Sequence, residues 1–148
     1  MPGVETSFMS DEREFVDTNV LVYAHDVSAG AKRDRAQELL TSLWASGHGC
    51  LSIQVLQEFY VTVTRKVARP LDPGAAAQVV SDLGRWRTHA PQPHDVLEAI
   101  RLHGRNRISF WDAMILHSAA ALECRVVWSE DLKPGRSSAG VFIENPFA

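Results

Sequence analysis

Four acidic side chains stand at positions that solubility alone does not explain. Asp17 lies in the stretch FVDTNVLVY, where a short apolar strand is expected to pass into an apolar helix. Asp131 follows the apolar stretch RVVWS, Asp112 lies in the first turn of a predicted helix, and Glu58 lies inside another largely apolar helix. Ligands of open parallel sheets bind outside the carboxyl ends of the strands, so we expect Asp17 and Asp131 at such an edge.

These four carboxylates predict a metal-dependent site if the fold brings them together. Like charges in one pocket raise each other's pKa, and a divalent cation relieves that repulsion. The histidines show no paired zinc spacing and the two cysteines are far apart in the sequence, so the ligands would be oxygen atoms alone. Oxygen ligation favours Mg²⁺ or Mn²⁺, which assist hydrolysis of phosphodiesters. The residues themselves therefore predict a metal-dependent phosphoryl-transfer site.

Each of the four carboxylates also has a purely structural explanation. Asp17 and Asp131 could each satisfy backbone groups at a turn. Asp112 follows Ser109 by three residues, as in a capping box at a helix start. Glu58 could pair with a basic residue of its own helix, Arg65 or Lys66. The combination of the four, and no single one of them, favours a functional site.

The composition is that of one ordinary globular domain. The chain has 148 residues, of which 45% are hydrophobic and 22% charged, and its formal net charge is -3. This acidic balance argues against a general basic coat for nucleic acid. Residues 1–13 lack the basic and apolar regions of a secretion signal, so we expect a flexible N-terminal tail before a single domain at 14–148. Two isolated cysteines and the lack of an apolar run of about 20 residues predict a soluble, cytoplasmic protein.

Apolar periodicity and capping residues predict alternating strands and helices. Strands are expected at 14–17, 48–52, 125–129 and 140–146, with an extended linker or short strand at 88–93. Helices are expected at 18–26 with Thr18 or Asn19 as cap, at 31–46, 53–69, 94–103 and 110–123, and from Pro73 behind an Asp72 cap. The segment 133–139, rich in Gly, Pro and Ser, is expected to be a mobile loop. Helices that separate short strands favour an α/β domain around a mostly parallel sheet.

Two of these helices carry more specific expectations. The long helix before Pro70 contains the β-branched run 61–64, whose propensity favours a strand, but the length of the uninterrupted segment favours a helix. In the helix at 94–103, Val96, Leu97 and Ile100 recur at helical spacing and are expected to face the core.

The acidic motifs, taken in order, resemble a known family. FVDTNVLVY, LSIQVLQEFYVTVTRK, ISFWDAMILHSA and VVWSEDL are similar to the successive acidic motifs of PIN domains, especially the toxins of VapBC toxin-antitoxin pairs. The similarity runs from about 14 to 146. It implies an α/β/α sandwich with a central, mainly parallel sheet and a Mg²⁺- or Mn²⁺-dependent ribonuclease. It also implies that Asp17, Glu58 and Asp112 are the core metal-binding acids and that Asp131 is the fourth.

The last motif departs from the family pattern by one extra acid. The resemblance assigns Asn19 and Ser129 to polar positions that support the site through hydrogen bonds. Where the family commonly has Ser or Thr followed two residues later by an acid, this chain reads Ser129, Glu130, Asp131. Asp131 has the motif spacing, and Glu130 is the reserve for the same role.

The resemblance also implies partners for the chain. VapC-like toxins cut RNA, with transfer RNA or ribosomal RNA loops as usual targets; they form homodimers and are silenced by a cognate antitoxin. Apolar residues that could serve such surfaces, although each is more simply explained by core packing, are Trp44, Phe59, Tyr60 and Trp86. Basic residues that could contact the phosphate backbone are Lys32, Arg33, Arg35, Arg65, Lys66, Arg69, Arg101, Arg105 and Arg107.

Other functions remain open on the sequence alone. A non-catalytic binding module with a PIN fold, or a PIN nuclease of RNA maturation without toxin function, would carry the same acids. A phosphatase of the haloacid dehalogenase type is disfavoured, because it needs a second aspartate at position 19, where this chain has Asn19.

Overall fold

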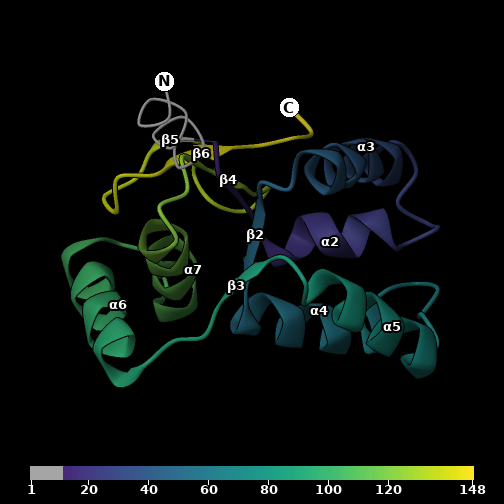
Figure 1. The fold of residues 1–148 in the computed structure, drawn as a ribbon, viewed down its shortest axis with the longest axis horizontal. Coiled ribbons are helices and arrows are strands. Elements are labelled where there is room, and N and C mark those ends of the chain that lie inside the picture. Colours follow the sequence, from purple (N-terminus) through teal and green to yellow (C-terminus); the bar gives the residue numbers. More distant parts are fainter. Residues whose placement is uncertain (1–11) are drawn as a thin grey trace.

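A six-stranded sheet runs through the part of the chain, residues 12–148, that the computed structural model describes (Figure 1). The strands are β1 (Glu14–Val16), β2 (Gly49–Ser52), β3 (Arg87–His89), β4 (Val126–Trp128), β5 (Gly135–Arg136) and β6 (Phe142–Glu144). Their order across the sheet is β3-β2-β1-β4-β6-β5. Neighbouring strands are parallel except for the antiparallel pair of β5 and β6. The predicted mainly parallel sheet is therefore confirmed.

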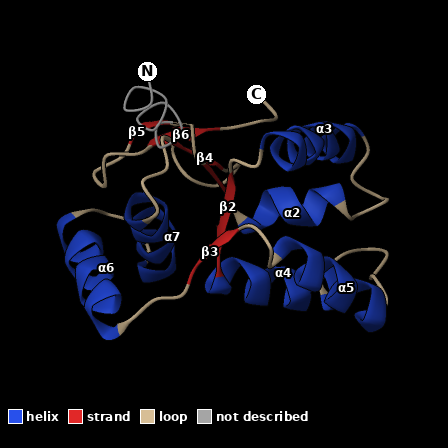
Figure 2. Ribbon diagram, in the orientation of Figure 1, coloured by secondary structure: helices blue, strands red, loops and turns tan. Residues whose placement is uncertain are grey.

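Helices cover both faces of this sheet (Figure 2). They are α2 (Thr18–Ala24), α3 (Ala31–Ser46), α4 (Ile53–Arg65), α5 (Pro73–Leu83), α6 (Pro93–Arg105) and α7 (Phe110–Ala121). The chain steps from β1 to β2 to β3 in one direction and then returns over the sheet to β4. Because parallel crossovers are right-handed, this reversal places α6 and α7 on the face opposite α2 to α5. The predicted α/β/α sandwich is confirmed.

Local sequence signals account for most helix ends. Helix α3 ends as predicted before Gly47, whose φ of 76° is left-handed and favours glycine. The Asp72 side chain accepts hydrogen bonds from the first backbone N–H groups of α5, also as predicted. The cap of α2 was predicted wrongly, because Asp17 and neither Thr18 nor Asn19 occupies that position. The side chain that begins the helix is thus one of the candidate ligands.

Helix α4 forms despite its β-branched run, as predicted, but it ends earlier than Pro70. The Ser52 hydroxyl accepts a hydrogen bond from Val55 N and starts the helix. The Thr64 hydroxyl donates to the Tyr60 carbonyl at 2.6 Å, so its polar group is satisfied within the helix. After Lys66 the chain turns back, and Leu71 N donates to the Val63 carbonyl at 2.8 Å. This tertiary hydrogen bond replaces the next turn of helix.

The hydrophobic core lies on both faces of the short central strands. Phe15 and Val16 of β1 are fully buried, as is Phe59 of α4. The two cysteines are free and buried, which agrees with their interpretation as small apolar residues. Gly49 is required where β2 meets Trp86, since a Cβ atom there would lie 2.5 Å from the indole ring.

The face of helix α6 that packs against the core is opposite to the predicted one. Val96, Leu97 and Ile100 are 37%, 55% and 49% exposed, whereas Asp95, Ala99 and Leu102 are buried. The prediction that the three large apolar residues face the core is wrong. A strongly apolar stripe on α6 therefore lies at the surface.

A buried polar anchor explains this rotation of α6. Asp95 Oδ2 accepts a hydrogen bond from Gln92 N at 2.7 Å, and Asp95 Oδ1 lies 2.7 Å from His117 Nε2 on α7. The ring of His89, at the end of β3, lies 3.5 Å from the same carboxylate and 2.7 Å from the Ser118 hydroxyl. The hydrogen bond from Gln92, followed by that from His117, lowers the pKa of Asp95 to about 2. An ionised side chain with these partners cannot turn outward without losing them.

The segment predicted as a loop at 133–139 is partly ordered by pairing. It contains β5, and Ser137 N donates to the Val141 carbonyl at 2.9 Å, which closes a hairpin with β6. The Gly, Pro and Ser content of the segment does not predict a strand, because β5 forms through pairing with β6 and not through local propensity. The extended stretch predicted at 88–93 is observed as β3, shifted toward its N-terminal end.

The predicted tail falls mostly outside the described residues, which begin at Glu12. The division into a tail at 1–13 and a single domain at 14–148 stays a prediction. Arg13 belongs with the folded part, since its guanidinium donates to the Leu122 carbonyl at 3.0 Å. Within residues 12–148, none of the helices has the length and apolar character needed to cross a bilayer.

We predict that Asp95→Ala lowers the free energy of unfolding by about 2 kcal/mol at pH 7, because it removes charge-assisted hydrogen bonds that hold α6. The folded pKa of Asp95 lies below its ordinary value, so this stabilisation is present above pH 4 and is lost as the pH falls toward 2. Urea unfolding at pH 7 and pH 3 measures both effects. Glu98→Ala, at an exposed acid on the same helix, should change stability by less than about 0.5 kcal/mol. Equal effects of the two substitutions would contradict the anchoring role.

Candidate metal centre

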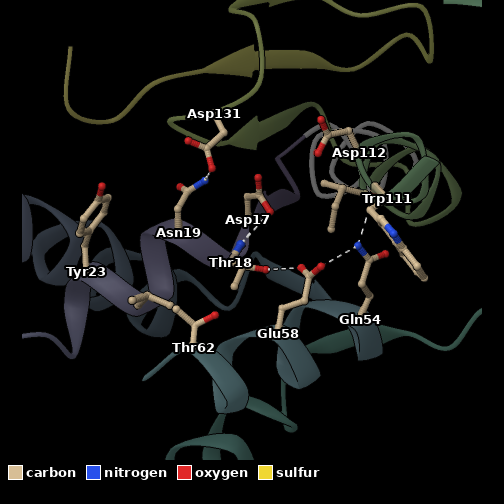
Figure 3. Close-up of a pocket in the computed structure, with 12 residues that line it drawn as sticks. Asp17, Thr18, Asn19, Tyr23, Gln54, Glu58, Thr62, Trp111, Asp112 and Asp131 are labelled. Atoms are coloured by element: carbon tan, nitrogen blue, oxygen red, sulfur yellow. Dashed lines mark hydrogen bonds between the residues drawn. The ribbon is translucent and has the colours of Figure 1, made fainter. Parts of the chain in front are cut away.

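The four predicted carboxylates line one pocket of about 380 Å³. Asp17 directly follows β1, Glu58 comes from α4, Asp112 from the first turn of α7, and Asp131 from the turn after β4. Figure 3 shows Asp17 near the middle, with Asp131 and Glu58 on opposite sides of it and Asp112 beside α7. Strands β1 and β4 are neighbours at the point where the strand order reverses, which is where open α/β sheets bind ligands.

Asp17 caps helix α2, as its structural explanation requires, and it also lines the pocket with the other three acids. It is 8% exposed, its Oδ1 accepts from Thr18 N at 2.7 Å, and its Oδ2 accepts from the Ser129 hydroxyl at 2.8 Å. Burial raises its pKa to about 6, and the negative charges of Glu58 and Asp112 act in the same direction. The hydrogen bonds from Ser129 and Thr18 oppose this increase and only partly offset it. A nearby positive charge would stabilise the ionised form of this buried carboxylate.

Glu58 is held by polar neighbours and by no basic residue. Its Oε1 accepts from the Thr18 hydroxyl at 2.8 Å, and its Oε2 accepts from Gln54 Nε2 at 3.3 Å. The Gln54 amide also donates to the Trp111 carbonyl at 3.2 Å and so joins α4 to the start of α7. Among residues 12–148, no ion pair forms between Glu58 and the basic residues that follow it on α4.

Asp112 makes only half of the expected capping box. The Ser109 hydroxyl accepts a hydrogen bond from Asp112 N at 3.0 Å and caps α7. Within the described part of the chain, the Asp112 carboxylate itself accepts no hydrogen bond, although the box would have used it. This carboxylate is therefore available to the pocket that it lines.

Asn19 and Ser129 form the hydrogen bonds expected of supporting residues. Asn19 Nδ2 donates to Asp131 Oδ2 at 3.1 Å, while Asn19 Oδ1 accepts from Glu130 N at 3.2 Å. The Ser129 hydroxyl donates to Asp17 and accepts from Asp131 N at 3.2 Å. These bonds connect the carboxyl ends of β1 and β4 directly. The roles assigned to the six residues remain predictions. The four acids and Asn19 line one pocket, and Ser129 is buried behind it, where it contacts Asp17.

The two adjacent acids after Ser129 point to different places. Asp131 lines the pocket, whereas Glu130 does not. Glu130 Oε1 accepts from the Tyr23 hydroxyl at 2.6 Å, and its Oε2 lies 2.5 Å from Lys32 Nζ. Both oxygens of Glu130 thus have partners on α2 and α3.

The oxygen atoms of the four acids suit a hard divalent cation, although their side chains do not converge on one point. All four acids supply oxygen, and their crowding is relieved by a cation of the Mg²⁺ or Mn²⁺ type. Among the described residues, no three His, Cys, Asp or Glu side chains stand close enough to hold one ion. Hydrogen bonds to Thr18, Gln54 and Asn19 hold Glu58 and Asp131 apart (Figure 3). Binding of a cation would have to exchange some of these bonds for metal ligation.

Sequence reasoning missed several residues that shape the pocket. Thr18 and Gln54 orient Glu58, and Tyr23 and Trp111 line opposite sides of the pocket (Figure 3). Gln54 precedes Glu58 by four residues, so its helical spacing could have revealed the contact. Trp111 is 62% exposed at the edge of the pocket, and only its position next to Asp112 gave a signal.

Three of the nine predicted basic residues have partners within the described part of the chain. Lys32 binds Glu130, Arg35 donates to the Pro146 carbonyl, and Arg101 pairs with Glu98. Lys66 lies nearer the acids, since it lines a second hollow that shares Thr18, Glu58 and Thr62 with the pocket. Lys66 is therefore the best placed of the set to contact a phosphate next to the acids.

We predict that Asp17→Asn raises the free energy of unfolding of the metal-free protein above that of the wild type, and that this gain is larger at pH 7 than at pH 4. Because the folded pKa of Asp17 is raised from 3.8 to about 6, its favourable contribution is complete below pH 4 and is lost as the pH rises through 6. The pKa shift of about two units corresponds to about 3 kcal/mol, at about 1.4 kcal/mol per unit. The free energy of unfolding of the variant should therefore gain up to about 3 kcal/mol on that of the wild type over that range.

Urea unfolding in EDTA at both pH values measures this gain. An asparagine still caps the helix, so loss of the cap does not mask the effect. The same pH dependence in both proteins would contradict an electrostatic cost at Asp17.

Comparison with solved structures finds proteins of the same fold. A DNA-bound VapBC complex from Salmonella typhimurium aligns with a TM-score of 0.65 and 17% identity over 91% of this chain and 98% of that one. VapBC2 from Rickettsia felis, bound to a DNA fragment from its promoter, gives 0.65 and 19% over 89% and 97%. VapC20 from Mycobacterium tuberculosis, described as a toxin that cleaves the Sarcin-Ricin loop, gives 0.59 and 20% over 80% and 89%.

The comparison with curated proteins finds no match. The family model of the PIN domain matches residues 15–136, which include all four carboxylates and the strands that position Asp17 and Asp131. The resemblance inferred from the acidic motifs is thereby confirmed, and the chain belongs to the PIN domain family.

Proposed function

We propose that this protein is a Mg²⁺- or Mn²⁺-dependent endoribonuclease and the toxin of a VapBC-type toxin-antitoxin pair. The observation that carries the proposal is the set of four carboxylates around one pocket at the carboxyl ends of β1 and β4. Asp17, Glu58, Asp112 and Asp131 would hold the cation. The bound cation would supply charge neutralisation and an acidified water to the hydrolysis of a phosphodiester.

The chain's own residues orient the groups around that reaction. Ser129 fixes the carboxylate of Asp17, Asn19 fixes that of Asp131, and Thr18 with Gln54 fixes that of Glu58. Orientation of this kind reduces the reorganisation needed when charge develops in the transition state. A water molecule attacks the phosphorus atom and the P–O3′ bond breaks, as in other metal-dependent nucleases, so the products carry a 5′-phosphate and a 3′-hydroxyl.

RNA is the substrate that the relatives support best. One of them is described as cleaving the Sarcin-Ricin loop, and a structured RNA loop is a fitting substrate here too. Loops offer unstacked nucleotides whose backbone can reach a recessed pocket. Action on transfer RNA or ribosomal RNA would place the protein in the cytoplasm.

A cognate antitoxin and a second copy of the chain are the proposed protein partners. Two of the similar structures are VapBC complexes, which supports an antitoxin for this protein. The exposed stripe of Val96, Leu97 and Ile100 on α6 supports a homodimer, because a monomer rarely leaves such a stripe uncovered. Of the aromatic residues considered for these surfaces, Trp44 and Tyr60 are exposed, whereas Phe59 and Trp86 are buried.

Two alternatives make different predictions. A non-catalytic PIN-fold module would bind Mn²⁺ and RNA but leave the RNA intact. A PIN nuclease of RNA maturation would cut RNA, but its expression without a partner would not arrest growth.

We predict that the purified protein cuts total RNA in Mg²⁺ or Mn²⁺ and not in EDTA. Asp17→Asn and Asp112→Asn should each lower the rate by at least about 100-fold, since a lost ligand removes several kcal/mol of charge stabilisation. Glu98→Gln, at an exposed acid on α6, should cut like the wild type. Gel analysis with mapping of the 5′ ends measures rate and site. Folded wild-type protein that binds Mn²⁺ and cuts no RNA would favour the non-catalytic module.

We predict that Leu97→Asp weakens self-association at least tenfold, about 1.4 kcal/mol, because it places a charge in the apolar stripe of α6. Light scattering coupled to size exclusion should give twice the chain mass for the wild type and a single chain mass for the variant. Glu98→Gln serves again as the control on the same helix. A wild type that stays monomeric at high concentration would refute the dimer.

A further inference from the structure

Glu130 lies beside the pocket with both carboxylate oxygens engaged away from it. The Tyr23 hydroxyl donates to Oε1 at 2.6 Å, and Lys32 Nζ lies 2.5 Å from Oε2. The side chain of Glu130 is only 22% exposed, whereas that of Lys32 is 45% exposed. Partial burial strengthens this pair compared with an ion pair at the open surface.

The same contacts involve three separate parts of the chain. Lys32 Nζ lies 5.0 Å from the centre of the Tyr23 ring and 5.8 Å from that of Phe147. The Tyr23 and Phe147 rings meet edge to face at 5.2 Å. Glu130 is thereby fixed to α2, to α3 and, through these rings, to the C-terminal segment after β6.

The backbone of Glu130 is connected to a candidate ligand. Glu130 N donates to Asn19 Oδ1 at 3.2 Å, and the Nδ2 of the same amide donates to Asp131 Oδ2 at 3.1 Å. A shift of Glu130 would disturb the amide that orients Asp131. The Glu130 side chain therefore controls the carboxylate next to it through backbone and amide contacts.

We propose that Glu130, Tyr23 and Lys32 form a positioning cluster that sets the Asp131 carboxylate for cation binding. Glu130 is a positioning residue and not a metal ligand, although it is adjacent to one and is acidic. The inference rests on the proposed function only in that Asp131 binds a divalent cation.

The ligand role and the positioning role of Glu130 differ in what they require of the side chain. A ligand must be an oxygen donor at position 130. A positioning residue needs only a partner of opposite charge at position 32 and a hydrogen-bonding group facing Tyr23. Exchanging the two charges removes the ligand, keeps the net charge and preserves the pair.

The decisive experiment measures Mn²⁺ affinity by isothermal titration calorimetry in the full chain. The variants are Glu130→Lys, Lys32→Glu and the double exchange of both, with Asp131→Asn as the ligand control. We expect Glu130→Lys alone to weaken Mn²⁺ binding at least about tenfold and the double exchange to recover to within about threefold of the wild type. Melting temperatures verify that each variant is folded.

A double exchange that binds Mn²⁺ as poorly as Glu130→Lys would overturn the proposal. Tyr23→Phe gives a second test without any change of charge, should the exchanged protein fail to fold. Loss of that hydroxyl should weaken Mn²⁺ binding about threefold if Glu130 is a positioning residue. Unchanged or tighter binding would mean that Glu130 gains freedom to act as a ligand, and it would refute the positioning role.

Failure of the proposed function has a different signature. If the wild type itself binds no Mn²⁺, the metal centre is refuted, and the positioning role is refuted with it. If the wild type binds Mn²⁺ and cuts no RNA, the result of the charge exchange still decides the role of Glu130.

Discussion

The carboxylate of Asp17, buried between two neighbouring strand ends, is the constraint on which the rest of the structure depends. It caps α2, and it accepts a hydrogen bond from Ser129 after β4. Strand order reverses between β1 and β4, so helices leave this edge toward opposite faces of the sheet and open a pocket. Burial makes the negative charge costly, and a cation bound in the pocket would offset this cost.

Hydrogen bonds from neighbouring polar side chains hold three of the four acids around the pocket in place. Glu58 is held by Thr18 and Gln54, and Asp131 is held by Asn19. Such bonds separate like charges when no cation neutralises them. Glu130 differs from these acids because its side chain does not line the pocket and its two oxygens are held by Tyr23 of α2 and Lys32 of α3. An acid's position in a motif therefore does not define its role, and its hydrogen-bond partners are more informative.

A second buried carboxylate, Asp95, fixes the orientation of α6, which lies on the face of the sheet opposite α2 to α5. Its partners on β3 and α7 hold α6 with Ala99 and Leu102 inward and with Val96, Leu97 and Ile100 outward. The helix therefore keeps the face that preserves the hydrogen bonds of Asp95 to Gln92 and His117. The same choice gives the protein an apolar surface suited to a partner, at the side of the sheet away from α2 to α5 (Figure 1).

Caps and apolar periodicity are local signals, and they determined an α/β domain with a mostly parallel sheet, four of the strands and the six helices. The resemblance of the acidic motifs to PIN domains added the sandwich, and the stretch at 88–93 stayed open between a strand and a linker. Asp72 and Gly47 mark helix ends wherever the chain lies in space. Only the tertiary structure decided the outward face of α6, the strand β5 and the different surroundings of Glu130 and Asp131. Each of these depends on a partner outside the segment concerned: His117 for Asp95, β6 for β5, and Lys32 for Glu130. Periodicity in one segment cannot reveal such partners.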